Sequence, residues 1–385
     1  MRNFLADFWM RLHIVLAALW MRLRAGIAGI WIFAPIAFIA FVLAGYTWWW
    51  QKIADGVRAS ADQFQIDQHA QGREAQWDAL DLSGFPYRVE ALFNGPRVTA
   101  PDRGFAWDGK SVVLDVEPLK PGHIALSFQG HQQLLYAKDG RLVEGGADAT
   151  KALVTIVAGA SGADQLGLEI EGLSGQGDWN AKHVELVVQN ATASARVSDD
   201  GDIDTTMPPI AVAATLNNVA VRGDLMLPLG PTITLVDIQA RFKFPMAPPD
   251  GANMNLLAAW RATRTPIEIQ NFALDWGGVT VTASGELKLD AQTRTEGWLR
   301  LKVGNHRRLL EVLTAEGWIS PNAHPSIAAA LNTLAFMSGD PERRVDVTVR
   351  FADGNAFLEL FGLVPIRMGP VAPLFGAPAP QPGSP

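Results

Sequence analysis

From residue 85 onward the chain alternates apolar and polar positions with a period of two, the pattern of strands that bury one face. The first run places Tyr87, Val89 and Phe93 on its apolar side. Similar runs follow at 112–116, 124–128, 166–170, 210–216, 236–244, 287–289, 299–303 and 345–351. Strands of parallel sheets covered on both faces read instead as continuous apolar runs. The pattern therefore predicts a mainly β fold built on an antiparallel sheet with one apolar face.

Glycine turn signals punctuate these runs. Asp-Gly pairs occur at 108–109, 139–140, 200–201 and 353–354, and Asn94-Gly95 ends the first run. Such pairs supply the positive φ angles that tight hairpins need. We therefore expect successive strands to be antiparallel neighbours.

Two helical stretches interrupt the strands late in the chain. Residues 305–316, with Asn305 as the N-cap, place Leu309, Leu310 and Leu313 on one side. Residues 326–337 do the same with Ile327, Leu331 and Leu334, and residues 254–262 are a short third candidate. Roughly fifteen strands at about 4.8 Å spacing make a sheet about 70 Å wide, and open sheets of that size curl. We expect a long curved half-pipe whose apolar face the short helices cover only in part.

The N-terminal region predicts a membrane anchor. Residues 25–50 carry no charge and, as a helix, span about 39 Å, enough for one tilted crossing of a hydrocarbon core about 30 Å thick. Arginines dominate residues 1–24, so the positive-inside rule places the N-terminus in the cytoplasm and the rest of the chain in the periplasm. Trp48, Trp49 and Trp50 then suit the membrane interface, although they are also consistent with a plain apolar helix end.

The apolar run is longer than the core of a cleaved signal peptide, and no A-x-A site follows it, so we favour an uncleaved signal anchor in the inner membrane. A start at Met21 is an alternative to Met1. Residues 51–72 predict an amphipathic stalk helix, with Ile53, Val57 and Phe64 at helical spacing. Residues 73–370 then form the periplasmic β-rich domain, and 371–385 a Pro-rich disordered tail.

Composition excludes several functions. The 385 residues include 32 Lys and Arg against 39 Asp and Glu, a net charge of −7, which argues against nucleic-acid binding. Hydrophobic residues make up 48% of the chain, enough to form a substantial core. There is no cysteine, so disulfides, thiol catalysis and cysteine zinc sites are excluded.

No sequence motif identifies a catalytic, nucleotide-binding or metal-binding site. Gly104, Gly109, Lys110 and Ser111 match the P-loop pattern, but the alternating residues after them predict a strand where a P-loop needs a helix, and we expect Asp108-Gly109 to form a hairpin turn instead. Asp200, Asp202 and Asp204 have calcium-loop spacing without the required Gly and Glu. His123 and His131 flank a strand without a carboxylate pattern that would complete a metal site. We therefore expect no enzyme activity, no cofactor, no metal and no nucleotide.

Several segments resemble the bacterial envelope family catalogued as domain of unknown function 2125. They are Trp77, the stretch 84–98 (GFPYRVEALFNGPRV), Phe105-Ala-Trp107, the stretch 119–128 (LKPGHIALSF) and the stretch 351–370. That family is grouped with AsmA-like proteins, so the resemblance implies a membrane-anchored, β-rich, grooved protein whose larger relatives are implicated in moving lipids between envelope membranes. It implies no reaction.

The most specific segment, residues 84–88, has two interpretations. In the structural one, Pro86 opens an edge strand and Phe85 packs the end of the sheet against the stalk helix. In the functional one, Arg88 contacts a lipid head group at the mouth of the groove.

These observations lead to one main hypothesis, a periplasmic protein that binds or moves phospholipid or another envelope lipid, or supports envelope maintenance. The candidate groove residues are Tyr87, Val89, Phe93, Leu126, Phe128, Phe242 and Phe244. A scaffold or protein-interaction module, its concavity filled by its own side chains, is the alternative, and an exported hydrolase is third.

Overall fold

The computed structural model describes residues 2–138, 141–159, 162–179, 181–197, 209–243, 265–290, 294–359 and 366–370. It describes the backbone alone for residues 2–35, 138, 141, 162 and 366–370. The predicted turns at 139–140 and 200–201, the predicted helix at 254–262, Phe244 and the tail 371–385 lie outside the described residues.

One antiparallel sheet of eighteen strands dominates the described chain, as the alternation predicts. Its first half comprises β1 (Glu74–Gln76), β2 (Ala79–Ser83), β3 (Val89–Asn94), β4 (Arg97–Ala100), β5 (Phe105–Glu117), β6 (Lys120–Lys138), β7 (Arg141–Asp148), β8 (Lys151–Gly159) and β9 (Gly162–Trp179). Its second half comprises β10 (Lys182–Val197), β11 (Pro209–Gly223), β12 (Thr232–Lys243), β13 (Ile267–Trp276), β14 (Val279–Leu289), β15 (Thr295–Gly304), β16 (Val345–Ala352), β17 (Asn355–Glu359) and β18 (Ile366–Pro370).

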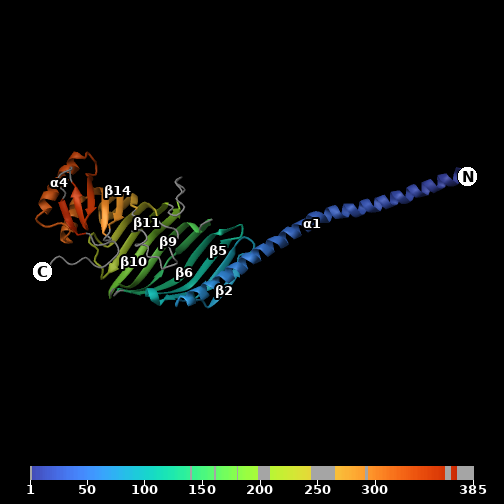
Figure 1. Ribbon diagram of the computed structural model, residues 1–385, viewed down its shortest axis with the longest axis horizontal. Helices are drawn as coiled ribbons and strands as arrows, with labels where there is room; N and C mark the ends of the chain where they lie inside the picture. The colour runs from blue at the N-terminus through green and yellow to red at the C-terminus, as the bar shows by residue number, and fades with distance from the viewer. Residues whose placement is uncertain are drawn as a thin grey trace.

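Helices lie at the two ends of this sheet. They are α1 (Arg2–Ala70), a 3₁₀ turn η1 (Pro101–Arg103), α3 (His306–Ala315) and α4 (His324–Met337). Figure 1 shows α1 projecting from the end that holds β2 and β5, whereas α4 lies at the opposite end beyond β14.

Strand order follows chain order over most of the sheet. From β9 to β18 each strand pairs with the next, always antiparallel. Strands β7 and β8 both fit between β6 and β9, on different halves of them. At the α1 end, β3 and β4 pair with different halves of β5, β2 pairs with β3, and β1 pairs with β4.

The register aligns apolar residues across the sheet. Residues directly opposite each other on paired strands share a face, so one row of side chains can be followed from strand to strand. This apolar row consists of Ala91, Leu114, Leu126, Val154, Leu168, Ala193, Ala214, Ile238, Phe272, Ala283, Leu301 and Val347. The adjacent row on the other face is mostly polar: Glu169, Thr192, Thr215, Asp237, Ala273, Thr282, Lys302 and Asp346.

Helices bury the apolar face at both ends of the sheet. At one end, Ala54 of α1 packs with Val89 and Val116, and all three are buried. At the other end, Leu310 of α3 and Ile327 of α4 belong to a larger core formed over β13 to β17. The two cores are separate, and the strands between them carry few buried side chains in the described chain.

The predicted turns are partly wrong. Asp353-Gly354 does join β16 to β17, with positive φ at both residues. Asn94-Gly95, in contrast, does not reverse the chain, because β3 and β4 pair with β5 in one unbroken register. Asp108-Gly109 lies inside β5, where it pairs with Gln132 and Gln133 of β6. The reversal occurs at η1, where Gly104 adopts the left-handed conformation.

Both late helices form near their predicted positions, and Asn305 is the N-cap residue of the first, as predicted. Asn305 precedes α3 with a positive φ of 52° and makes no side-chain capping bond. Its Nδ2 instead donates to the carbonyl of Gly278, 3.1 Å away. The side chain is therefore used to tie α3 to the β13–β14 turn.

The N-terminal helix is continuous from Arg2 to Ala70. Residues 25–35 of the predicted membrane span lie outside the part whose side chains are described. Within that part, no helix combines the length and apolarity that crossing a membrane requires.

Candidate functional site

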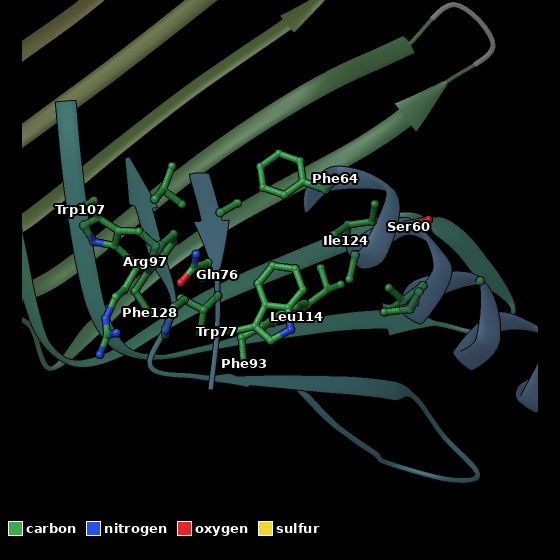
Figure 2. A pocket seen from close by; sticks show the side chains of 18 of the residues that line it. Ser60, Phe64, Gln76, Trp77, Phe93, Arg97, Trp107, Leu114, Ile124 and Phe128 are labelled. Atoms are coloured by element: carbon green, nitrogen blue, oxygen red, sulfur yellow. The ribbon is translucent and has the colours of Figure 1, made fainter. Parts of the chain in front are cut away.

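An apolar cavity of about 590 Å³ lies between α1 and the sheet. Its walls come from one side of α1 and from β1, β3, β4, β5 and β6. Ser60 and Phe64 of α1 and Trp77, Trp107 and Phe128 of the β layer are among the residues drawn in Figure 2. Its volume falls within the roughly 300–1,000 Å³ of typical ligand pockets.

Small residues set how α1 sits on the sheet. Ala54 and Ala61 are buried against it and allow close approach. Gly56 and Ser60 line the cavity but are themselves exposed, so they lie at its opening. An added Cβ at Gly56 would meet no atom within 4 Å. The helix therefore closes one side of the cavity and leaves an opening at these two residues.

Aromatic pairs form part of the inner wall. Trp77 and Phe93 meet edge to face with ring centroids 5.1 Å apart, and Trp107 and Phe128 do so at 5.9 Å. Edge-to-face pairs are favourable beyond their buried area, so each pair holds its rings in a fixed orientation. The wall is preformed by side chains that already contact one another.

The cavity has almost no charge. Among the described residues that line it, Arg97 alone is charged, and its Nε lies 3.3 Å from Asp108 Oδ1. Buried polar atoms that lack a hydrogen-bond partner in the described chain, such as Asp115 Oδ1 and His306 Nδ1, lie outside this lining. Such walls favour hydrocarbon over a polar ligand, because they offer few hydrogen bonds to replace lost hydration.

Beyond the cavity, the apolar row continues uncovered. Leu168 and its neighbour on the same face, Leu166, are 38% and 45% exposed on β9. Leu134 of β6, which pairs with Trp107, is also exposed. An apolar surface therefore extends from the cavity toward the middle of the sheet.

The predicted groove residues fall in different places. Phe93 and Phe128 line the cavity. Leu126 belongs to the apolar row, and Val89 is fully buried beneath α1. Phe242 lies farther along the same face, opposite Ile210 on β11. Tyr87 lies outside the cavity, because it belongs to the turn before β3 and is 87% exposed.

Arg88 is engaged by carboxylates. Its Nη2 lies 2.8 Å from Glu90 Oε2, and its Nε lies 3.5 Å from Asp115 Oδ1. Burial raises the pKa of Asp115, while the positive charge of Arg88 acts in the opposite direction. The predicted head-group contact would therefore compete with two existing ion pairs.

The segment around Phe85 fastens α1 to the sheet. The Phe85 ring contacts Trp50 edge to face, with centroids 5.6 Å apart, and it also contacts Tyr46. The Tyr46 hydroxyl donates to the carbonyl of Pro86. Phe85 thus packs against the helix as the structural interpretation expects, whereas Pro86 lies in a turn and does not open the strand.

The three tryptophans differ in their surroundings. Trp49 Nε1 donates to the carbonyl of Pro118 at 3.0 Å, and Trp50 Nε1 donates to that of Arg88 at 2.8 Å. Trp48 is exposed. Trp49 and Trp50 therefore hold the helix on the β domain.

The P-loop match and the two histidines form no site in the described chain, whereas Asp200, Asp202 and Asp204 lie outside the described residues. Residues 105–111 of the P-loop match are part of β5. His123 and His131 both lie on β6, where His131 contacts Asp148. No group of three His, Asp or Glu side chains in the part that the structure describes could hold a metal ion.

Sequence reasoning did not identify Gly56, Ser60, Trp77 and Trp107 as cavity residues. Gly56 and Ser60 carry a weak signal, since they are small residues four apart on a helix that is otherwise amphipathic. Trp77 and Trp107 fall within the segments that carry the family resemblance. Their proximity depends on pairing of β1 with β4 and β4 with β5, which periodicity does not reveal.

Together the fold and the cavity define an antiparallel β protein with an apolar chamber beneath its N-terminal helix. A family model described as "Uncharacterized protein conserved in bacteria (DUF2125)" matches residues 48–371. The match covers most of the chain and confirms the resemblance, so the protein belongs to this family. No curated protein and no solved structure matches the chain.

Proposed function

We propose that this protein is a periplasmic lipid-binding protein anchored in the bacterial inner membrane, which binds or moves envelope lipids. The observation that carries the proposal is the apolar row, which runs across the sheet but is covered by helices only at its ends. Contiguous exposed apolar surface is uncommon on soluble monomers and is typical of binding sites. Burying a methylene group is favourable by about 0.8 kcal/mol, so an acyl chain along this face gains substantially.

The shape that best suits this function is a half-pipe like that of AsmA-like proteins. The end covered by α3 and α4 supports binding along the middle of the trough and argues against passage through that end, because the two helices pack on β13 to β17. The cavity found in that core is small, about 80 Å³. Lipid would then enter and leave from the side or from the α1 end.

The proposed anchor is the segment 25–50. Its described part exposes Ile36, Phe38, Phe41 and Leu43, large apolar side chains that the β domain does not cover. Arginines before the segment favour a cytoplasmic N-terminus. This arrangement would hold the cavity under residues 53–64 close to the outer surface of the inner membrane.

Lipid extraction from the purified protein tests the proposal. The full chain is expressed in a bacterial host, purified in a mild detergent, washed and extracted with organic solvent for mass spectrometry. We expect phospholipid at a fixed ratio to protein, above that of an unrelated single-anchor protein purified in parallel. Equal amounts in the two samples would argue against lipid binding.

A non-lipid scaffold is the second candidate. It is favoured by Phe336 and Met337 at the end of α4, which are exposed at the far end of the domain from α1. Crosslinking in cells separates the two functions. A scaffold is expected to capture one dominant protein, whereas a carrier is expected to capture lipid.

A further inference from the structure

The cavity beneath α1 differs from the middle of the sheet in having walls from both the helix and the sheet, with a side open to solvent. Ile53 and Val57 of α1 lie over Leu114 and Ile124 of the sheet, and the aromatic pairs Trp77–Phe93 and Trp107–Phe128 contribute to its wall. A chain in this chamber would contact both the helix and the sheet, whereas one over Leu168 would contact the sheet alone. The chamber is therefore the stronger of the two apolar sites.

We propose that this chamber binds one long hydrocarbon chain of a membrane phospholipid, with the polar head group left outside, an inference that rests on the proposed lipid-binding function. The near-absence of charge in the lining selects for hydrocarbon. The membrane is the source, because α1 exposes an apolar stretch from Ile36 to Leu43 about two and a half turns before Ile53, the first residue of α1 that lines the chamber. The stalk helix is thus one wall of the binding site.

Gly56 and Ser60 determine access to the chamber. Both are exposed lining residues, and an added Cβ at Gly56 meets open space. A bulky side chain at Gly56 would lie across the opening without displacing backbone. Glycine inside a helix has a lower helix propensity than ordinary residues. Replacement of Gly56 is therefore not expected to destabilise α1.

A crosslinking experiment tests this assignment on the full chain in cells. Cells are fed palmitic acid that carries a diazirine, which they incorporate into phospholipid, and after irradiation the labelled peptides are mapped by mass spectrometry. Three proteins are compared: wild type, Gly56→Phe, and Gly45→Phe. Gly45 is a matched control, because it lies on the same helix, also faces open space and does not line the chamber. Thermal unfolding confirms that all three proteins are folded.

In the wild type we expect phospholipid adducts both on residues 93–128 of the chamber and on the exposed strand β9. Gly56→Phe is expected to reduce the chamber adducts several-fold while those on β9 persist, and Gly45→Phe is expected to change neither. Chamber adducts that are unchanged in Gly56→Phe, or that carry only the mass of free fatty acid, would overturn the chamber assignment and leave the proposed function standing. Failure to label either region of the wild type would overturn both.

Discussion

Trp50 on the helix donates its indole N–H to the backbone carbonyl of Arg88 at 2.8 Å, just before the strand that α1 covers. The same indole packs edge to face on Phe85. One tryptophan therefore joins the stalk helix to the segment of the chain that most specifically carries the family resemblance. Because α1 forms one wall of the cavity, these two contacts of Trp50 fix the position of that wall relative to the sheet.

Removal of the Trp50 hydrogen bond is expected to loosen the helix. Trp50→Phe retains an aromatic ring but loses the donor, at an expected cost of about 1 kcal/mol in the free energy of unfolding. Hydrogen exchange of residues 51–70 should become faster. Trp48→Phe is the matched control, since Trp48 is exposed. Equal exchange in the two variants would show that the bond does not fix the helix.

The helical cover at the far end depends on Ile327, which is 1% exposed in the core formed with β13 to β17. Ile327→Ala should lower the free energy of unfolding by about 2–5 kcal/mol, because it leaves a cavity in a packed core. Phe336→Ala, on the same helix but 88% exposed, should change it by less than about 0.5 kcal/mol. Chemical denaturation of the two variants compares them, and similar losses would contradict the packing of α4.

Asp115 is expected to make stability depend on pH. Burial raises its pKa, so the folded protein holds this proton more tightly than the unfolded chain does. The resulting stabilisation is present below the ordinary pKa of 3.8 and is lost as pH rises through the raised value. Asp115→Asn avoids burial of the charge, so its Tm should exceed that of the wild type near neutral pH.

The difference in Tm between Asp115→Asn and the wild type should vanish toward about pH 3, where the carboxyl group is protonated in both folded and unfolded protein. Thermal unfolding across the pH range measures this convergence. A Tm advantage for Asp115→Asn that is constant with pH would show that the effect is one of packing and not of charge.

Membrane topology can be tested with introduced thiols, because the chain contains no cysteine. We expect Phe336→Cys to react with a membrane-impermeant maleimide in cells with a permeable outer membrane, since the side chain is 88% exposed and the domain is proposed to be periplasmic. Ala6→Cys, before the proposed anchor, should react only after lysis. Reaction of both or neither in intact cells would contradict the proposed orientation.

The strands were predictable because one face of the sheet is apolar along its whole length. In β14, for example, Val279, Val281 and Ala283 are buried while Thr280 and Thr282 are exposed, which gives the period of two directly. The late helices were predictable for the same reason, from the spacing of leucines that pack on the sheet. Local periodicity was sufficient where burial alone decides the structure.

Local signals failed where distant pairing decides the structure. Asp108-Gly109 has the composition of a hairpin turn, yet β4 and β6 pair with it on both sides and keep the chain extended. The cavity was not predictable for a related reason. Its walls come from α1 and from strands whose pairing brings Trp77 and Trp107 close together. No local sequence pattern predicts this long-range pairing.

The central claim is that lipid lies on the apolar face of the sheet, and a photo-crosslinking amino acid placed at Leu168 tests it most directly. Leu168 is exposed on that face, whereas Thr192, on the neighbouring strand β10, belongs to the polar row of the other face. After irradiation of cells that produce the full chain, mass spectrometry should find phospholipid attached at position 168 and none at position 192. Absence of lipid at 168, or equal labelling at both positions, would contradict the account.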